Sequence, residues 1–300
     1  MNNIFLQVMR ERMMVDRQLV ESVYLPWLAG AMNGNMSLGP NGTTGKKAFA
    51  ASAHSFTKEA FAMSGRSASM AMMDATAGSV AVVPIFGEFL KYGSQCTYGA
   101  NEIVPAIYQA GDMKNIVALV LDVDSGGGAE SAVPPFIEAI KYVQSKGKPV
   151  VLHGDMVASA AYYIGSFCDY LMADNLISSA FGSIGVYVSY MDYKEQLEKK
   201  GIKHKTIYAP QSDLKNHEYR ELVDNDNSEP LINNILIPSA TRFINTVKQN
   251  RKGKISEESD VYRGKLYEGE DIVKEGLADG FGTLYDALEV ASGMAMMRRG

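Results

Sequence analysis

Continuous apolar runs alternate with amphipathic stretches from Val80 onward. The runs "VAVVPIFGEF", "NIVALVLDV" and "KPVVLH" are rich in β-branched residues and predict strands buried on both faces of a sheet, the third stopping at Gly154. Between them, "ANEIVPAIYQAGDM" and "SAVPPFIEAIKYVQSKG" have helical spacing, and the second helix should begin near its prolines and end at Gly147. This alternation predicts an α/β fold built from layered, right-handed βαβ units.

Shorter elements continue the alternation toward the C-terminus. "SAAYYIGSF" predicts a helix, "YLMA" a short strand, and "MDYKEQLEKKG" a helix that ends at Gly201. "KHKTIYA" predicts another strand, which precedes the long helical stretch "PLINNILIPSATRFINTVKQNR". A helix, a turn and a second helix in "GEDIVKEGLADGFGTLYDALEVASGM" complete one domain over residues 79–292, and residues 293–300 predict a frayed tail.

The N-terminal part of the chain has a different pattern. Apolar residues recur at near-helical spacing in "IFLQVMRERMMVDRQLV", so residues 1–29 predict a helical segment. Residues 30–78 are rich in Gly, Ser, Ala and Met, which predicts a flexible arm with one short helix around residues 56–63. The alternative is that this arm packs as ordinary irregular structure.

Charge, apolar run length and cysteine content limit which partners and which cellular compartment we expect. The formal net charge of −5 disfavours nucleic acid and anionic membranes as main partners. No run reaches the roughly 20 apolar residues of a membrane helix, and Arg10, Glu11 and Arg12 interrupt the apolar stretch that a signal peptide needs. Cys96 and Cys168 alone cannot form a disulfide framework. We therefore expect a cytoplasmic protein without a membrane anchor.

A glycine-rich loop, "DVDSGGGAE" at residues 122–130, follows a predicted buried strand. Consecutive glycines let backbone amides approach a bound group closely, so the loop predicts an oxyanion hole or a phosphate site. It lacks the lysine and the hydroxyl residue of a P-loop and the spacing of a dinucleotide fingerprint, which disfavours nucleotide binding. The alternative is a plain flexible turn.

Ser159 lies where a strand passes into a helix of small residues. Unpaired amides at a helix N-terminus stabilise an alkoxide or a tetrahedral oxyanion, and Ala160 and Ala161 leave room for an extended peptide. Ser159 is therefore a candidate nucleophile. The alternative is the common role of serine as a helix N-cap.

A serine nucleophile needs a base, and histidine is the first residue to consider. The four histidines are His54 in the N-terminal arm, His153 inside a strand, His204 at the start of another, and His217 in a polar stretch. Only His217 stays open as a base. Lys215 is the other candidate, because burial against apolar neighbours and a helix N-terminus can make a lysine neutral enough to accept a proton.

Several motifs occur together in a characteristic order. They are "DVDSGGG", "ASAAYYIGSFCDYLMAD", "SAFGSIGV", "YAPQSDLKN" and "YRGKLYEGEDIVKEGLADGFGTLYDAL". In these motifs the chain resembles the signal peptide peptidase A family of Ser–Lys proteases, over roughly residues 79–290. The resemblance implies an α/β fold of the Clp-protease/crotonase type, preceded here by the helical and flexible N-terminal extension.

The resemblance also implies roles for individual residues. Ser159 matches the nucleophile and Lys215 the general base of an acyl-enzyme mechanism that uses neither metal nor cofactor. Ser183 would orient the lysine amine by a hydrogen bond. The oxyanion hole implied by the resemblance consists of the amides of Gly127 or Gly128 and of Ala160.

The absence of an anchor and the character of the N-terminal arm resemble phage or prophage head-maturation proteases. This branch implies cleavage of capsid, scaffold or portal proteins, self-processing within residues 30–78, and association with proheads. The family resemblance itself implies a ring-like or dome-like homo-oligomer. One alternative is a cellular signal-peptide or peptide-degrading protease. The others are a crotonase-like acyl-CoA enzyme, which would need neither Ser159 nor Lys215, and a non-catalytic capsid scaffold.

Overall fold

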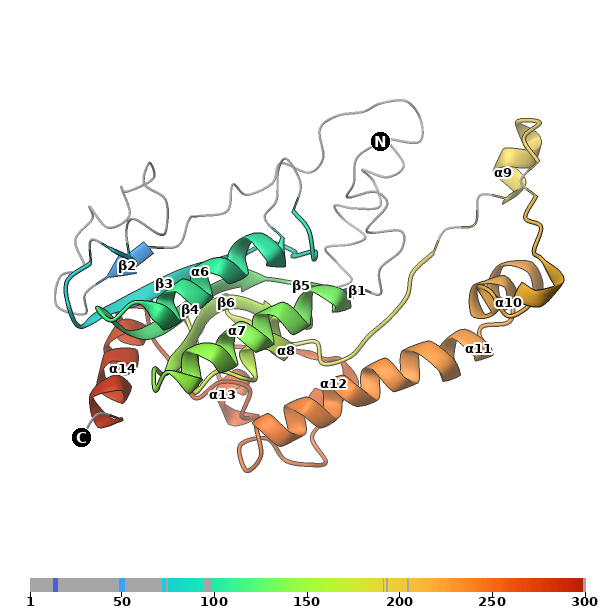
Figure 1. Cartoon of the computed structure of the whole chain (residues 1–300). Coiled ribbons are helices and arrows are strands. Elements are labelled where there is room, and N and C mark those ends of the chain that lie inside the picture. The colour runs from blue at the N-terminus through green and yellow to red at the C-terminus, as the bar shows by residue number, and fades with distance from the viewer. Residues whose placement is uncertain are drawn as a thin grey trace.

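A mainly parallel sheet forms the centre of the fold (Figure 1). The computed structural model describes residues 13–15, 49–51, 72–73, 75–93, 99–190, 192, 194–203 and 205–298. Within them, an eight-stranded sheet has the order β10-β7-β6-β4-β3-β2, with β8 beside β6 and β9 beside β8. Its strands are β2 (Phe49–Ala51), β3 (Ser79–Phe86), β4 (Ile116–Ser125), β6 (Val150–Ala158), β7 (Tyr170–Ala173), β8 (Ala180–Gly182), β9 (Leu266–Glu268) and β10 (Gly280–Phe281).

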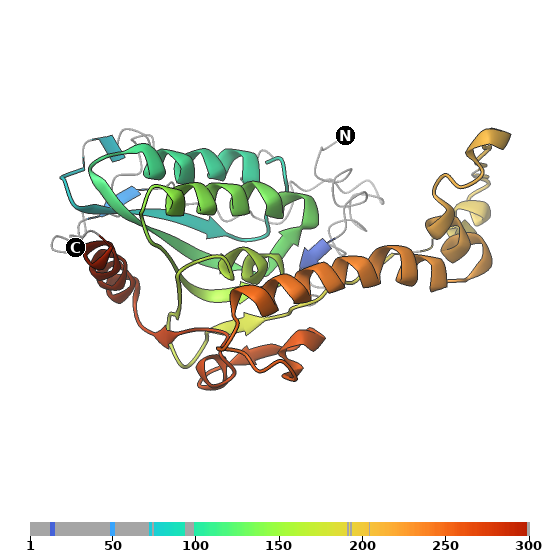
Figure 2. The ribbon, with the colours of Figure 1, turned by 60° about the horizontal axis from the view of Figure 1, so that its bottom comes forward.

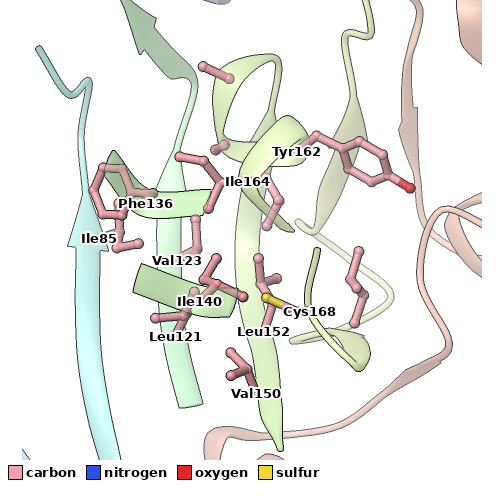
Figure 3. Close-up of a cluster of buried hydrophobic side chains, with 14 of the residues drawn as sticks. Ile85, Leu121, Val123, Phe136, Ile140, Val150, Leu152, Tyr162, Ile164 and Cys168 are labelled. Atoms are coloured by element: carbon pink, nitrogen blue, oxygen red, sulfur yellow. The ribbon is translucent and has the colours of Figure 1, made fainter. Parts of the chain in front are cut away.

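Helices cover both faces of this sheet, which explains why its central strands β4 and β6 begin with continuous apolar runs. Figure 2 shows α6 (Ala100–Asp112) and α7 (Val133–Ser145) on one face and α14 (Leu284–Met297) on the other. On the first face, side chains of β4 and β6 pack against Phe136 and Ile140 of α7 (Figure 3). On the second face, Val120 and Val151 pack with Leu288 of α14.

The predicted strand–helix alternation is confirmed in this part of the chain. α6 continues through Pro105, α7 has a proline in its first turn, and Gly147 follows the end of α7 with a positive φ of 77°. One boundary was wrong, because β6 does not stop at Gly154. It continues to Ala158, since Met156, Val157 and Ala158 pair with β8.

The C-terminal end of the domain also differs from the prediction. Residues 293–300 were expected to fray, but α14 continues to Met297. Its N-terminus has a capping box between Thr283 and Asp286, and Ala291 and Ala295 are buried against the sheet. This packing stabilises the last turns. The remaining element of this region is α13 (Asp271–Lys274).

A helical projection extends from the domain, and we call residues 187–236 the arm. Figures 1 and 2 both show α9 and α10 at its end, away from the sheet, with α12 running between arm and domain. The strand predicted in "KHKTIYA" is not formed in its described residues, 203 and 205–209, because no sheet is near to pair with it. The helices are α9 (Lys194–Lys199), α10 (His217–Asn225), α11 (Glu229–Leu231), a π-helical turn (Ile232–Leu236) and α12 (Ile237–Asn250); 3-10 turns are Glu130–Ala132, Pro210–Ser212 and Asp260–Arg263.

Two short segments before residue 72 are described. β1 (Met13–Val15) is a strand where a helix was predicted, and it pairs antiparallel with β5 (Gly127–Ala129). β2 pairs antiparallel with β3 at the sheet edge. Before residue 72, the other residues of the predicted N-terminal helical segment (1–29) and of the predicted flexible segment (30–78) lie outside the described residues. They include the short helix near residues 56–63 and the self-processing region. In the described part of the chain, every helix is too short or too polar to cross a membrane.

Candidate active site

Ser159 occupies the junction between β6 and α8 (Ala160–Gly165), with backbone φ 54° and ψ −117°. Such a conformation is strained for a residue with a Cβ and costs on the order of 1–3 kcal/mol. Two backbone hydrogen bonds hold it: Ser159 N–H donates to Gly182 O at 2.9 Å, and Tyr163 N–H donates to Ser159 O at 2.9 Å. A strained serine between a strand and a helix is also how α/β-hydrolases present their nucleophile.

The surroundings of Ser159 argue against a simple capping role. An N-cap serine accepts a hydrogen bond from an amide in the first helical turn, but the Ser159 side chain makes no such bond with α8. Ser159 is only 2% exposed, and Ala160 and Ala161 beside it are buried. The first amides of α8 have no acceptor within the helix. The serine hydroxyl and a potential oxyanion donor at Ala160 therefore lie together.

The predicted glycine loop forms β5, next to this junction. Ser125 supports it, because its hydroxyl donates to Gly87 O at 2.6 Å and accepts from Gly127 N–H at 3.1 Å. A Cβ at Gly128 would overlap the Phe89 carbonyl oxygen, so only glycine fits there. Gly127 N–H is thus engaged by Ser125, and Gly128 is the glycine whose close backbone approach the fold requires.

Ser183 lies beside Ser159 because β6 and β8 are paired. Ala158 is opposite Gly182 in this parallel pair, so the residues that follow them are neighbours. Ser183 also has a positive φ of 54°, and its N–H donates to Lys265 O at 2.9 Å. Both serines line one pocket. The structure therefore brings the predicted nucleophile and the predicted supporting serine together.

The pocket next to Ser159 has a volume of about 630 Å³. The segment after β8 forms one wall, and α12 and the turn before β9 form the others. Its lining is mixed, with aliphatic side chains beside the hydroxyls of serines and tyrosines and one arginine. The lining residues are Ser159, Ser183, Ile184, Gly185, Val186, Tyr187, Val188, Ser189, Ala240, Ile244, Tyr262, Arg263 and Gly264.

Lys215 is not at this pocket. It is exposed, in the turn between Pro210–Ser212 and α10, and both views show α10 at the far end of the arm from α8. The structure therefore places the two members of the predicted dyad on different parts of the chain. His217, the other candidate base, begins α10 and lies on the same arm.

His153 has a structural environment away from the pocket. Its Nδ1 and Nε2 lie 3.0 Å from Asp122 Oδ1 and from Asp174 Oδ1. By strand alternation it shares the α14 face with Val151, whereas the neighbouring Leu152 faces α7 and α8. Burial opposes the charged imidazolium, but the two carboxylates outweigh it and raise the pKa of His153. His54 and His204 lie outside the described residues.

Several residues that hold Ser159 and the glycine loop in place were not predicted from the sequence. Phe89 N–H donates to Gly127 O at 3.2 Å, and Ala129 N–H donates to Phe89 O at 3.0 Å. The Gly182 carbonyl accepts from Ser159 N–H, and the Ser125 hydroxyl accepts from Gly127 N–H in the glycine loop. These contacts join residues far apart in sequence, and no local pattern marks them. Only the glycine–serine order in "SAFGSIGV" indicated that this segment approaches the site.

Comparisons with known proteins identify the family of the chain. Residues 142–297, just over half of the chain, match Peptidase family S49. Protease 4 of Haemophilus influenzae is 25% identical over 229 residues, covering 73% of this chain but only 35% of that protein. A putative protease of Synechocystis is 27% identical, covering 66% of this chain and 70% of that protein. A putative protease of Methanocaldococcus jannaschii is 30% identical, covering 58% and 55% respectively.

Among solved structures, a serine-to-alanine mutant of the 1510-N membrane-bound stomatin-specific protease is 16% identical, with a TM-score of 0.46. The match covers 72% of this chain and 84% of that chain. The family match includes Ser159, Ser183 and Lys215 but begins after the glycine loop. The predicted resemblance is thus confirmed at the level of the family, and the phage head-maturation branch is not shown.

Proposed function

Because this chain belongs to peptidase family S49, we propose that it is a serine endopeptidase with Ser159 as nucleophile and Lys215 as general base. The observation that carries the proposal is the strained, buried backbone of Ser159, which is held at a pocket without capping its helix. Backbone strain of this kind persists only where the surrounding structure enforces it, and it is concentrated at functional sites.

The proposed reaction proceeds through an acyl-enzyme. Lys215 Nζ, as the neutral amine, takes the proton of Ser159 Oγ while the oxygen attacks the peptide carbonyl carbon. The ammonium then gives this proton to the leaving amine as the C–N bond breaks. The lysine then takes a proton from water as the water oxygen attacks the ester carbonyl carbon, and it gives this proton to Ser159 Oγ as the ester C–O bond breaks and the acid product leaves. Ser183, which lines the same pocket, orients the amine.

Amides around Ser159 stabilise the oxyanion in this proposal. The first-turn amide of Ala160 and the amide of Gly128 are the donors, and Gly127 contributes only if its N–H leaves the Ser125 hydroxyl. Loss of one such donor costs about 3–4 kcal/mol of transition-state stabilisation in comparable enzymes. Replacement of Gly128 is therefore expected to slow the reaction strongly.

Lys215 reaches Ser159 in an assembly of copies in this proposal. The arm that carries the lysine exposes large apolar side chains, of which Ile207 is 92% and Leu214 is 73% exposed. Burying such residues is favourable, and a second copy of the chain offers a surface to do so. The dyad would then form between copies, which agrees with the homo-oligomer that the family resemblance implies.

The proposed substrate is an extended polypeptide. The pocket beside Ser159 offers Ile184, Val186 and Ile244, so it accepts an apolar side chain. The named relatives are proteases of cellular organisms, which makes a cellular peptide-processing role a better fit than capsid maturation. Capsid, scaffold or portal substrates stay a prediction that no comparison supports. The absence of a metal or cofactor requirement likewise stays a prediction.

Cleavage of casein by matched variants tests the proposal. Ser159→Ala and Lys215→Ala should each lower turnover by at least about 10³-fold, because nucleophile and base act as a unit. Lys205→Ala, an exposed lysine on the same arm, should keep full activity. A fluorophosphonate probe should label Ser159 in the active protein. Full activity of either dyad variant would contradict the assignment.

A further inference from the structure

β1 lies along the glycine strand of the candidate site. The antiparallel register places Met13 opposite Ala129, Met14 opposite Gly128, and Val15 opposite Gly127. A segment more than a hundred residues away in sequence therefore occupies the edge of β5, next to the proposed oxyanion donors. In the described chain, the other neighbour of β5 is Phe89, which forms a parallel bridge with Gly128.

The backbone of β5 divides its hydrogen-bonding groups between two neighbours. On one side, Phe89 N–H donates to the Gly127 carbonyl at 3.2 Å, and Ala129 N–H donates to the Phe89 carbonyl at 3.0 Å. Because successive residues of a strand direct these groups to opposite sides, the N–H and C=O of Gly128 face β1, opposite Met14. The amide proposed to bind an oxyanion thus faces the N-terminal segment.

The direction of β1 matches that of a substrate. Ser125 of β4 pairs with Val157 of β6, so Gly127 and Ser159, each two residues further, lie at about the same level. β1 runs from Ala129 toward Gly127, so its last residue, Val15, lies at the end of β5 that is level with Ser159. A peptide whose N-terminal side pairs with β5 would reach the nucleophile in the same way.

We infer that Met13–Val15 is a tethered, substrate-like strand that inhibits the protease by occupying the edge of β5. This inference rests on the proposed function, and it adds that β1 occupies the substrate-binding edge of β5. Peptide recognition by strand addition depends on main-chain hydrogen bonds, so the inhibition should depend on the backbone of Met14 more than on its side chain. An arriving substrate must displace β1 before it can bind.

Met14→Pro in the full chain tests this inference. Proline removes the amide that faces Gly128 and disfavours the paired strand, so kcat/KM for an internally quenched, extended peptide should rise by about tenfold. Met14→Ala is the matched control, since it keeps the amide, and its kcat/KM should stay near that of the original chain. A synthetic peptide of residues 9–18 should inhibit Met14→Pro competitively, whereas its counterpart with proline at the Met14 position should not.

A second readout separates this inference from the proposed function. Hydrogen exchange at the Gly128 amide should be protected in the original chain and in Met14→Ala, and become faster in Met14→Pro. Equal exchange and equal kcat/KM in all three proteins, with Ser159 still labelled by a fluorophosphonate, would overturn the autoinhibitory strand alone. Failure of every variant to react with the probe would overturn the proposed function, and the inference with it.

Discussion

At the residue scale, two serines with left-handed backbone conformations define the candidate site. Ser159 and Ser183 each have a φ of 54°. Their conformations depend on carbonyl oxygens supplied by Gly182 and Lys265, which are brought into place by sheet pairing. The sequence predicts which serines matter through the order of the motifs, but their strain follows from contacts that only the folded chain makes.

Gly128 provides a direct test of the glycine strand. In Gly128→Ala the new Cβ overlaps the Phe89 carbonyl, so β5 must shift. We expect a stability loss of about 1–3 kcal/mol from this overpacking. Displacement of the oxyanion amide should lower kcat by about 10²-fold or more. Both effects are measured by urea unfolding and peptide hydrolysis.

Gly293→Ala is the control for this substitution. Gly293 lies within α14, and a Cβ there meets no atom within 4 Å. Alanine favours a helix over glycine by roughly 1 kcal/mol, so this variant should be as stable as the original chain or more stable, with unchanged activity. Normal hydrolysis by Gly128→Ala would exclude β5 from catalysis.

His153 should make stability depend on pH. Its folded-state pKa is raised by Asp122 and Asp174 against the opposing effect of burial. The stabilising contribution of the charged histidine is therefore fully present below its ordinary pKa of about 6.5 and is lost as pH rises through the higher folded value. Asp286, whose low pKa depends mainly on Thr283 and partly on His153, faces the same group.

The change in unfolding free energy between about pH 6 and about pH 9 measures this effect. It should be about 1.5 kcal/mol smaller in His153→Gln, at the lower end for a charged hydrogen bond because the Asp174 side chain is 38% exposed. Gly293→Ala, which changes no titratable group, should keep the pH dependence of the original chain. Equal pH profiles for His153→Gln and the original chain would show that the imidazolium pair contributes nothing.

At the element scale, strands with a continuous apolar pattern were predictable, including the short β7, whereas β8 and β9 were not. β4 and the first part of β6 are continuous apolar runs, which identify a sheet covered on both faces. β8 and β9 are three residues each and exist because they pair with each other. The reverse error occurred in "KHKTIYA", whose pattern suits a strand but which has no neighbour to pair with on the arm.

β1 and α14 show how tertiary contacts override local pattern. The apolar spacing near Met13 favours a helix, but Met13–Val15 pairs with the edge of β5. The last residues of α14 have the composition of a frayed end, but Ala291 and Ala295 pack against the sheet. In both cases the deciding partner is distant in sequence, so the periodicity of one segment could not reveal it.

At the scale of the whole molecule, the two residues of the predicted dyad lie on different parts of the chain: one on the domain around the sheet, which we call the body, and one on the arm. Ser159 is buried in the body, and Lys215 is exposed next to α10 on the arm. The motifs predicted the identity of both residues, but sequence order contains no information on which copy of a chain supplies each one. An arm with exposed Ile207 and Leu214 indicates contact with a neighbour.

A mixture of two inactive variants tests whether the dyad forms between copies. Ser159→Ala keeps an intact arm, and Lys215→Ala keeps an intact nucleophile. If each arm serves a neighbouring body, an equimolar mixture, unfolded and refolded together, should recover about a quarter of the original activity, because half of the bodies have Ser159 and half of their neighbours supply Lys215. A mixture in which both variants carry Ser159→Ala is the control and should stay inactive. If the arm instead serves its own body, the first mixture also stays inactive, and a dyad shared between copies is excluded.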